Sequence, residues 1–551
     1  MNGRTMKFRT PNSGIVATLL ILILSARCFT AELSARRDGL LKRPNILWIS
    51  LEDISPDLRC YGDAYAITPH IDRLAQQGVL FTNAFSHSGV CAPTRSGIIT
   101  GMYPTTIGTH HMRANGVPPA YVRCFTEYLR NAGYYCTNDA KTDYQFAAPI
   151  TAWDDNRRGA HWRNRPDSTS PFFCVINLTS THESRIRQPE QAYQKLRASL
   201  MPEQRHDPAA ALVPPYYPDT PLTRSDWARY ADLITFTDRR VGKILQDLEE
   251  DGLADETVVF FWGDHGRGLP RAKRWIYDSG IRVPLIVRWP GHVPEGARRD
   301  DLVCFLDLAP TALALAGVAV PEHFQGQVIL GPERAKEREF IFAARDRMDE
   351  TRDIIRAVRD KRFKYIRNFM PELPYAQTID YMDQMPTMRE LRRLHEAGEL
   401  NEHQRLFFRD RKPVEEFYDT LADPHEIRNL VADPTFQPQL QRMRVALDVW
   451  ARETEDLGLI PEPILDDRAR PEGRWRTTQT PQIVIQNGRV SISCRTMGAS
   501  IAYALGKPAP GQRSDWKLYS QPIALPADTR LRARACRLGY RDSPIARAVV
   551  R

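Results

Sequence analysis

Short apolar runs alternate with longer amphipathic segments along the first half of the chain. The runs at 44–50, 171–178, 257–262 and 283–288 are dense in Ile, Val, Leu and Phe, which is typical of strands buried on both faces of a sheet. Between them, residues 226–250 place apolar side chains at helical intervals. This alternation predicts an α/β domain with a mostly parallel sheet flanked by helices.

The pattern changes further along the chain. Strand-like runs at 340–343 and 363–366 precede long charged helical stretches, so we expect residues 335–460 to form a smaller α+β subdomain. After a Pro-rich break, residues 474–551 show short runs with period-two alternation, which predicts a small all-β module. The main α/β domain is then expected to span residues 43–334.

The N-terminal segment has the order of an export signal. Arg4, Lys7 and Arg9 precede an apolar run at 15–24, and small residues follow before residue 31. This order predicts a signal peptide at 1–31 and therefore an exported protein, periplasmic or secreted. The apolar run is short for a bilayer, so no stable membrane span is expected. An uncleaved N-terminal anchor is the alternative.

The net charge of +9 belongs to the two ends of the chain. Residues 1–31 carry four basic side chains and no acidic one, and residues 474–551 carry fourteen basic and three acidic ones. The main body is therefore slightly acidic, and its charge gives no support for nucleic-acid binding. The mean hydropathy of -0.45 argues against a protein with many membrane spans.

Acidic and imidazole side chains follow two of the predicted strands. Glu52 and Asp53 come just after the run at 44–50, and Asp264 and His265 come just after the run at 257–262. Ligands collect at the carboxyl ends of parallel strands, so neighbouring strands would let these side chains hold one hard cation. Taken singly, either pair could instead cap a loop.

The sharpest motif is Cys91-Ala-Pro-Thr-Arg95, which Thr100-Gly101 follows. Together with the acidic strand end before it and Asp264-His265-Gly266 after it, this segment resembles the signature of type I sulfatases, members of the alkaline phosphatase superfamily. The resemblance covers roughly residues 43–460. It implies an alkaline-phosphatase-like fold, and it implies that a formylglycine-generating enzyme converts Cys91 into Cα-formylglycine.

The same resemblance implies a calcium site. Its ligands would be Glu52, Asp53, Asp264 and His265, together with the modified Cys91. Glu52 departs from the family pattern, which usually has Asp there. Most of these ligands are oxygen donors, which favours Ca²⁺ over Zn²⁺.

The resemblance also assigns catalytic roles. Arg95 would support the formylglycine diol, and one diol hydroxyl would attack sulfur with Asp264 as the base. Lys141 and Lys273 would offset the charge on the sulfate oxygens, and His182 would protonate the leaving group. The second hydroxyl would then expel sulfate and regenerate the aldehyde.

One histidine of the family pattern is absent, because position 143 is Asp. Its role in collapsing the covalent intermediate would fall elsewhere or be altered, and His110 and His111 are candidates for a catalytic or substrate role. Arg345 and Arg347 are predicted sugar contacts, with a surface ion-pair network as the alternative.

Segments 108–113, 136–144 and 415–429 are similar to bacterial proteins classed with heparan N-sulfatase, and residues 474–551 resemble a fibronectin-III-associated, chitobiase C-terminal-like module. These resemblances imply a sulfuric ester hydrolase that removes sulfate from a sulfated carbohydrate, with N-sulfoglucosamine as one candidate. The alternatives are a phosphonate or phosphate monoester hydrolase of the same fold, and a non-catalytic glycan-binding relative.

Overall fold

The computed structural model describes residues 43–506 and 516–551. The predicted signal peptide at 1–31 lies outside the described residues. Within the two described ranges, no helix combines the length and the apolar character needed to cross a membrane. Residues 45–551 form one compact unit.

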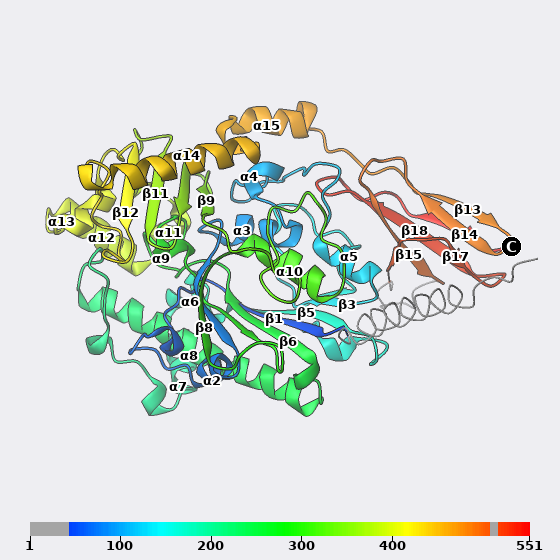
Figure 1. Cartoon of the computed structure of the whole chain (residues 1–551), viewed down its shortest axis with the longest axis horizontal. Helices are drawn as coiled ribbons and strands as arrows, with labels where there is room; N and C mark the ends of the chain where they lie inside the picture. Colours follow the sequence, from blue (N-terminus) through cyan, green and yellow to red (C-terminus); the bar gives the residue numbers. More distant parts are fainter. Residues whose placement is uncertain (1–42, 507–515) are drawn as a thin grey trace, which may run out of the picture. The chain divides into compact units, whose positions relative to one another are not determined.

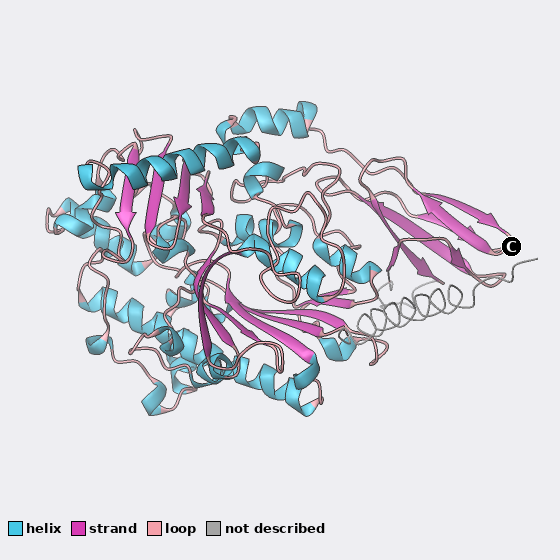
Figure 2. Ribbon diagram, viewed as in Figure 1, coloured by secondary structure: helices cyan, strands magenta, loops and turns pink. Residues whose placement is uncertain are grey.

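An eight-stranded sheet forms the centre of this unit (Figures 1 and 2). Its strands run in the order β4-β3-β5-β1-β6-β7-β2-β8. β7 is antiparallel to both of its neighbours, and the other paired strands are parallel. This arrangement confirms the predicted α/β class. The strands are β1 (Asn45–Leu51), β2 (Val79–Phe85), β3 (Tyr135–Asn138), β4 (Asp155–Asn156), β5 (Phe172–Leu178), β6 (Thr257–Gly263), β7 (Leu285–Arg288) and β8 (Ala297–Cys304).

Helices cover both faces of the sheet, and the side chains of β1 alternate between them. Leu47 and Ile49 belong to the core under α2 (Pro69–Gln76) and α8 (Pro221–Glu250). Ile46 and Trp48 belong to the core on the opposite face. The helices there are α3 (Cys91–Thr100), α5 (Phe125–Asn131) and α10 (Leu308–Leu315), which Figure 1 shows on the other side of the strands. β1 is thus buried on both faces, as its continuous apolar run predicts.

Helix α8 begins five residues before the predicted segment 226–250. The hydroxyl of Thr220 accepts a hydrogen bond from the backbone N–H of Thr223, and Pro221 occupies the first helical turn. Both are favoured helix starts, so local capping extends the helix beyond its amphipathic part. The shorter helices are α4 (Pro104–Ile107), α6 (Glu183–Ile186), α7 (Glu190–Ala198) and α9 (Asp278–Ile281).

A second, antiparallel sheet has the order β12-β11-β10-β9. α14 packs against β10 and β11, and its buried Leu447 and Trp450 join the same core as Leu47 of the main sheet. The subdomain is therefore fused to the α/β domain through one continuous core. Its elements are β9 (Ile341–Arg345), β10 (Ile355–Arg359), β11 (Phe363–Asn368), α11 (Asp380–Asp383), α12 (Pro386–Glu396), α13 (Glu402–Arg405), β12 (Glu415–Asp419), α14 (Gln437–Glu453) and α15 (Glu462–Ala469).

The C-terminal segment forms two small antiparallel sheets around a core of its own, which includes Val490, Ile492 and Leu531. This confirms the predicted β module. One sheet contains β13 (Gln482–Gln486), β14 (Arg489–Ser493) and β17 (Ile523–Ala524), and the other contains β16 (Lys517–Tyr519), β15 (Ser500–Leu505), β18 (Arg530–Cys536) and β19 (Ala546–Val549).

The module packs closely on segment 116–120 of the α/β domain. Arg537 donates a hydrogen bond of 2.6 Å to the carbonyl of Pro118. A Cβ atom at Gly498 would lie 2.0 Å from the carbonyl oxygen of Ala120, and one at Gly539 would lie 2.5 Å from that of Gly116. Only glycine at these two positions allows the backbones to approach this closely.

Candidate active site

Three neighbouring strands end at the same level of the main sheet. Leu51 at the end of β1 pairs in register with Leu178 of β5 and with Gly263 of β6. The backbone N–H of Asp264 donates to the carbonyl of Leu51 at 3.1 Å, which ties two of the strand ends together. Residues more than two hundred positions apart in the sequence, such as Asp53 and Asp264, are thus brought together at the carboxyl ends of these strands. The side chains that follow the strands are Glu52, Asp53, His182, Glu183, Asp264 and His265.

Asp53, Asp264 and His265 form a fully buried cluster whose ligand-type atoms all lie within 4.8 Å of one another. Oδ1 of Asp53 and Nε2 of His265 form an ion pair at 3.1 Å, and within the described residues neither atom has a further hydrogen-bond partner. Burial by itself lowers the pKa of His265, but the Asp264 and Asp53 carboxylates outweigh it and raise that pKa to about 10. Two carboxylates and an imidazole buried within 4.8 Å of one another are an environment that a bound cation stabilises, so this donor set fits a divalent metal.

The other two predicted metal ligands lie at the edge of this cluster. Oε1 of Glu52 is 2.8 Å from Nζ of Lys141 and 3.6 Å from the guanidinium of Arg95. The Cys91 side chain lies close enough to His265 to contribute to the upward shift of the imidazole pKa. The structure therefore brings three of the five residues into one cluster and pairs Glu52 with cations.

Cys91 is the first residue of α3, and its side chain is buried. Helix geometry places Arg95 one turn further on the same face. Arg95 donates to Oδ1 of Asn177 at 2.7 Å and to Oδ2 of Asp264 at 3.2 Å, so it links α3 to two strands of the sheet. Sequence reasoning passed over Asn177. The signal that could have found it is a polar side chain near the end of an otherwise apolar strand.

Lys273 reaches the cluster from the loop after β6. Its ammonium lies 2.7 Å from Oδ2 of Asp53, 2.9 Å from Oε1 of Glu183 and 3.4 Å from Nε2 of His182. Burial lowers the pKa of Lys273, but the Asp53 and Glu183 carboxylates more than offset this effect, so the side chain remains protonated. Burial and then the Lys273 charge lower the pKa of His182.

Glu183 is a second residue that sequence reasoning missed, although it directly follows His182. Its carboxylate accepts hydrogen bonds from both terminal nitrogens of Arg274, at 3.0 and 2.8 Å, in addition to its contact with Lys273. Glu183 therefore fixes the position of the predicted sulfate-binding lysine. A buried glutamate between two cations has no signature in a single sequence.

Asp143 lies beside the predicted nucleophile. Its Oδ2 is 2.9 Å from Nζ of Lys141, and its carboxylate lies close enough to Cys91 for that side chain to lower the carboxyl pKa. Burial raises the pKa of Asp143, but the Lys141 charge and hydrogen bond outweigh burial, so the net shift is downward. The position that lacks a histidine thus places an ionised carboxylate against residue 91.

His110 and His111 belong to a different set of contacts. Their rings lie 4.2 Å apart, and burial lowers the pKa of each to about 4. Nδ1 of His111 accepts the backbone N–H of Arg347 at 3.3 Å, and the Arg347 guanidinium makes a two-pronged pair with Glu462, at 2.7 Å on each side. Arg347 also lines an open cavity of about 520 Å³.

Arg345 is fully buried behind the loop after β6. It donates to Asp353 at 2.6 Å, to Gln377 at 3.2 Å and to the carbonyl of Arg274 at 2.8 Å. These contacts give Arg345 a supporting position beneath Arg274, away from any open surface.

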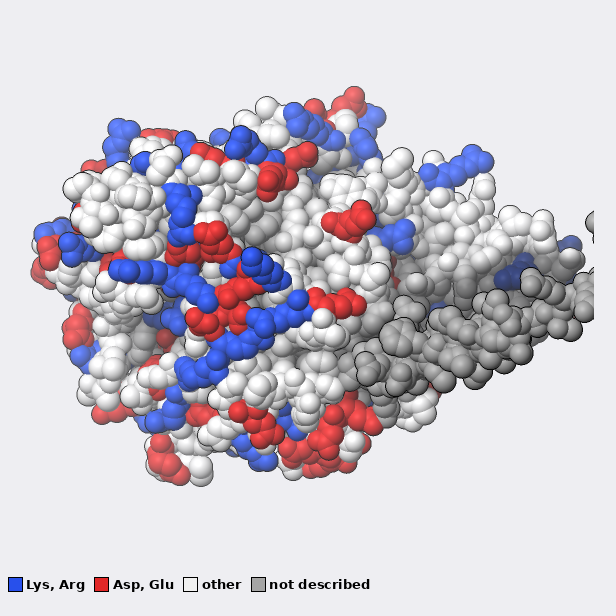
Figure 3. Space-filling view, in the orientation of Figure 1, with Lys and Arg blue, Asp and Glu red and all other residues white. Residues whose placement is uncertain are grey.

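The visible surface gives no sign of a one-sided charge. On the face shown in Figure 3, lysine and arginine side chains lie among aspartate and glutamate side chains, with no broad basic area. This intermingling agrees with the slightly acidic balance of the main body.

The chain matches three family models. Residues 44–318 match the sulfatase family, and residues 263–406 match the C-terminal part of N-sulphoglucosamine sulphohydrolase. Residues 490–549 match the Fn3 associated family. Together these matches cover the main sheet, strands β9, β10 and β11 of the second sheet, and most of the C-terminal module.

Similar proteins and structures agree with this assignment. An ulvan-active sulfatase of Formosa agariphila is 41% identical, over 95% of this chain and 96% of that protein. The N-sulphoglucosamine sulphohydrolase of Homo sapiens is 26% identical, over 78% of this chain and 94% of that protein.

Solved structures share the fold. A structure of a protein in complex with its substrate D-glucosamine-2-N,6-O-disulfate has a TM-score of 0.54 at 18% identity and covers 75% of this chain and 99% of that chain. The phosphonate monoester hydrolase of Agrobacterium radiobacter has a TM-score of 0.56 at 18% identity and covers 75% of this chain and 96% of that chain. The motif at Cys91, the strand-end cluster and these matches lead to one conclusion: the chain belongs to the sulfatase family of hydrolases, with an alkaline-phosphatase-like fold.

Proposed function

We propose that the protein is an exported sulfatase that removes sulfate from a sulfated polysaccharide, at the site around Cys91. One observation carries the proposal above the others. Three cationic side chains, Arg95, Lys141 and Lys273, converge on the buried Cys91 at the N-terminus of α3. A helix N-terminus surrounded by cations is suited to an anionic group such as a sulfate ester.

The proposal requires that a formylglycine-generating enzyme act on Cys91. The hydrated aldehyde would supply a hydroxyl nucleophile that a thiol does not. Two hydrogen-bonding groups, the Asp143 carboxylate and the His265 imidazole, already face the side chain of residue 91. Both can hold a hydroxyl group at that position.

The same site is proposed to hold Ca²⁺ through Asp53, Asp264 and His265, with Glu52 as a further ligand. The close approach of Oδ1 of Asp53 to Nε2 of His265, with no further hydrogen-bond partner for either atom in the described residues, supports this assignment. Three of the four side chains are carboxylates, which favours a hard cation. When bound, the ion would withdraw charge from a sulfate oxygen and make a nearby hydroxyl more acidic.

The remaining side chains are proposed to handle the substrate's charge and protons. Lys141 and Lys273 would bind the sulfate oxygens, and Glu183 would keep Lys273 in place. Nε2 of His182 lies beside Nζ of Lys273, and it is the proposed donor to the departing sugar oxygen, a role for which it must take up a proton against its lowered pKa. Oδ2 of Asp264 lies next to Arg95 and would take the proton of the attacking hydroxyl.

Asp143 is proposed to do what the missing family histidine does. Its carboxylate contacts residue 91 directly and is paired with Lys141. It would accept a proton from the side chain at position 91 as sulfate is released. The geometry supports Asp143 for this role over His110 and His111, whose contacts are with each other and with Arg347.

The substrate class rests on the relatives. The protein of 41% identity is named for activity on ulvan, and the one of 26% identity is named for N-sulfoglucosamine. We propose a sulfated polysaccharide such as ulvan first and N-sulfoglucosamine second, because the higher identity extends over nearly the whole of both chains. Arg347, which lines the open cavity beside α15, is a proposed contact for a longer sugar chain.

Peptide mass spectrometry across residues 91–95 tests the proposal, on protein expressed with a formylglycine-generating enzyme. We expect the thiol of Cys91 to be replaced by an aldehyde, and sulfate to be released from ulvan oligosaccharides faster than from N-sulfoglucosamine. A known sulfatase treated in parallel controls the conversion step.

Three results would contradict parts of the proposal. A thiol at residue 91 beside a fully converted control removes the nucleophile. Faster turnover of a phenyl phosphonate than of a phenyl sulfate assigns the site to phosphonate esters. Sulfate release from N-sulfoglucosamine alone keeps the sulfatase but changes the substrate.

A further inference from the structure

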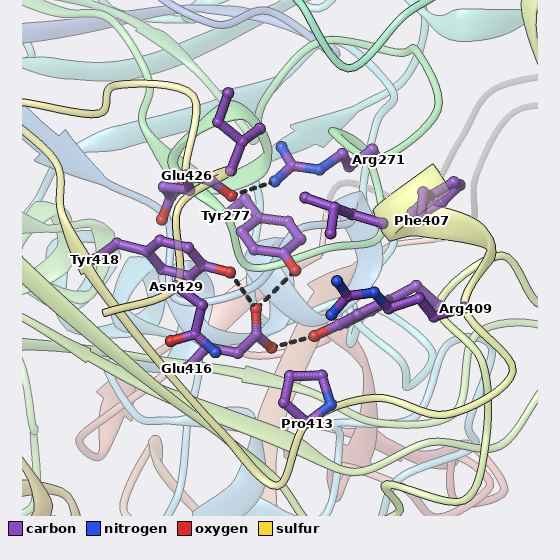
Figure 4. A pocket seen from close by; sticks show the side chains of 12 residues that line it. Arg271, Tyr277, Phe407, Arg409, Pro413, Glu416, Tyr418, Glu426 and Asn429 are labelled. Carbon is purple, nitrogen blue, oxygen red and sulfur yellow. Dashed lines mark hydrogen bonds between the residues drawn. The ribbon is translucent and has the colours of Figure 1, made fainter. Parts of the chain in front are cut away.

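A separate cavity of about 280 Å³ lies between the loop after β6 and the second subdomain (Figure 4). The loop contributes Arg271 and Tyr277, and the subdomain contributes aromatic rings, Glu416 and Arg409. Arg271 is only two residues from Lys273, but their side chains have different partners. None of the residues proposed for sulfate hydrolysis lines this cavity.

The acidic group in the cavity wall, Glu416, has all of its hydrogen-bond acceptor positions filled. The carboxylate of Glu416 accepts hydrogen bonds from the hydroxyls of Tyr277 at 2.9 Å, Tyr418 at 2.6 Å and Tyr375, and from the amide of Asn368 at 2.7 Å. A carboxylate has about four acceptor positions, and four donors fill them. Glu416 therefore holds the tyrosine wall together and leaves no acceptor for a ligand.

The basic group opposite, Arg271, has hydrogen-bond partners for only some of its donors. Arg271 is 5% exposed, and its guanidinium stacks 4.4 Å from the ring centre of Tyr216 and 4.0 Å from that of Tyr277. Its Nη2 donates to the carbonyl of Glu426 at 2.7 Å, whereas its Nη1 has no hydrogen-bond partner. A buried guanidinium with an open donor is costly unless an acceptor completes it.

A second arginine stands at the mouth. Arg409 is exposed, and in Figure 4 its guanidinium points toward the tyrosine hydroxyls. Across residues 43–506 and 516–551 its side chain makes no ion pair. The nearby carboxylate of Glu426 is engaged by Lys364 at 2.8 Å and by the backbone N–H of Asp278. The acids around the cavity are thus paired, while two arginines retain free donors.

We propose that this cavity binds the anionic group of a single sugar ring, a carboxylate or a sulfate, between Arg271 and Arg409. The rings of Tyr277 and Phe407 would face the C–H groups of the sugar, which are attracted to the negative face of an aromatic ring. The volume lies at the small end of ligand pockets, which suits one ring. The anion site rests on the two arginines, and the choice of a sugar as its carrier rests on the proposed function.

Calorimetric titration of the Cys91→Ala protein tests the proposal without turnover. The probes are D-glucuronate, glucose 6-sulfate and neutral glucose. We expect one of the two anionic sugars to bind at millimolar concentration or better, and glucose to bind at least about tenfold more weakly. Arg409→Ala should weaken the anionic sugar about tenfold, while Arg411→Ala, an exposed arginine that does not line the cavity, should change it less than twofold.

Glucose 6-sulfate can also enter the site at Cys91, so only the binding that Arg409→Ala removes is assigned to this cavity. The carboxylate and sulfate arms then identify the anion. Ile427→Phe, which narrows the cavity without touching either arginine, should abolish the same binding. Equal affinity in the Arg409→Ala and Arg411→Ala proteins, or equal affinity for glucose and both anionic sugars, overturns the proposal. Loss of sulfatase activity alone would bear on the proposed function and leave this binding result intact.

Discussion

Two buried groups of charged residues, each more than 90% buried, differ in how their charges are matched. In the second subdomain, Arg356 is held by Asp346 at 3.0 Å and by Asp456 at 2.6 Å, and Arg345 is held by Asp353 at 2.6 Å. At the carboxyl ends of the main-sheet strands, Asp53, Asp264 and His265 crowd together, and Oδ1 of Asp53 and Nε2 of His265 have no hydrogen-bond partner among the described residues beyond their own ion pair. Buried aspartates thus belong to a closed network of arginine pairs in one place and to a cluster suited to a cation in the other.

This difference in pairing distinguishes charged residues that stabilise the fold from those that serve the proposed reaction. A closed network of buried ion pairs is destabilised when one partner is removed, because the other is left as a bare buried charge. A cluster whose carboxylates share an imidazole, Lys273 and Arg95 is held by the surrounding fold, and its carboxylates gain from a bound cation. Residue type and burial alone do not distinguish the two networks; the unsatisfied atoms do.

The largest expected effect is the loss of activity in Asp264→Ala. This change removes a proposed metal ligand, the proposed base and one partner of Arg95. We expect kcat to fall by about 10³-fold or more, equivalent to about 4 kcal/mol. Sulfate release and bound calcium, measured on the same sample, check this. Asp264→Asn keeps the side-chain shape and should lose calcium as well; a variant that keeps both calcium and kcat contradicts the metal assignment.

In the closed network, Asp353→Ala should mainly affect folding. Asp353 is the carboxylate partner of both Arg345, at 2.6 Å, and Lys412, at 3.0 Å. Leaving two buried cations unpaired should lower the free energy of unfolding by about 3–5 kcal/mol in urea denaturation. The control is Asp448→Ala, which breaks an exposed pair with Arg367 and should cost less than about 1 kcal/mol. Equal effects of the two changes would remove the distinction between buried and exposed pairs.

The buried, neutral side chain of His87 allows a third test, in which pH changes the stability of the fold. Burial lowers the pKa of His87, which lies under α3, to about 4. A histidine whose folded pKa lies below its unfolded pKa of about 6.5 takes up a proton on unfolding, so the free energy of unfolding falls as pH drops from about 6.5 toward 4.

We expect His87→Gln to remove up to about 3 kcal/mol of this pH dependence. Melting temperatures at pH 7.5 and 4.5, for the variant and the parent protein, measure the difference. An unchanged slope between these pH values would show that His87 is not the group that titrates.

The smallest effect is expected at Asp143. Removing its charge in Asp143→Asn keeps the size of the side chain but weakens the pairing with Lys141 and with residue 91. We expect kcat to fall about 10- to 100-fold, with KM less affected, as for loss of a proton-transfer group. Asp143→His should retain more activity than Asp143→Asn. Asp139→Asn, on the same loop, should leave kcat unchanged; a similar loss there would point to loop structure instead.

Much of the fold could be predicted because the buried strands carry continuous apolar runs. β1, β5 and β6 fall where those runs predict them, and β1 and β6 are neighbours, so Asp53 and Asp264 meet. The contributions of Asn177 and Glu183 could not be predicted, because each depends on a contact with a residue distant in the sequence: Asn177 with Arg95, and Glu183 with Lys273. The contact of Asp143 with residue 91 is of the same kind: the sequence shows that a histidine is absent, while only the folded loop shows what takes its place.

The close packing of the C-terminal module has a consequence for how such chains can be recombined. The module rests on segment 116–120, and Gly116 in turn donates its N–H to the carbonyl of Gln145, two residues beyond Asp143. The module is therefore joined to the loop that carries Lys141 and Asp143 by a short backbone path. The module is thus part of the packing around this loop and is not a loosely attached domain. A C-terminal module grafted from another sulfatase would need a matching 116–120 segment to pack against.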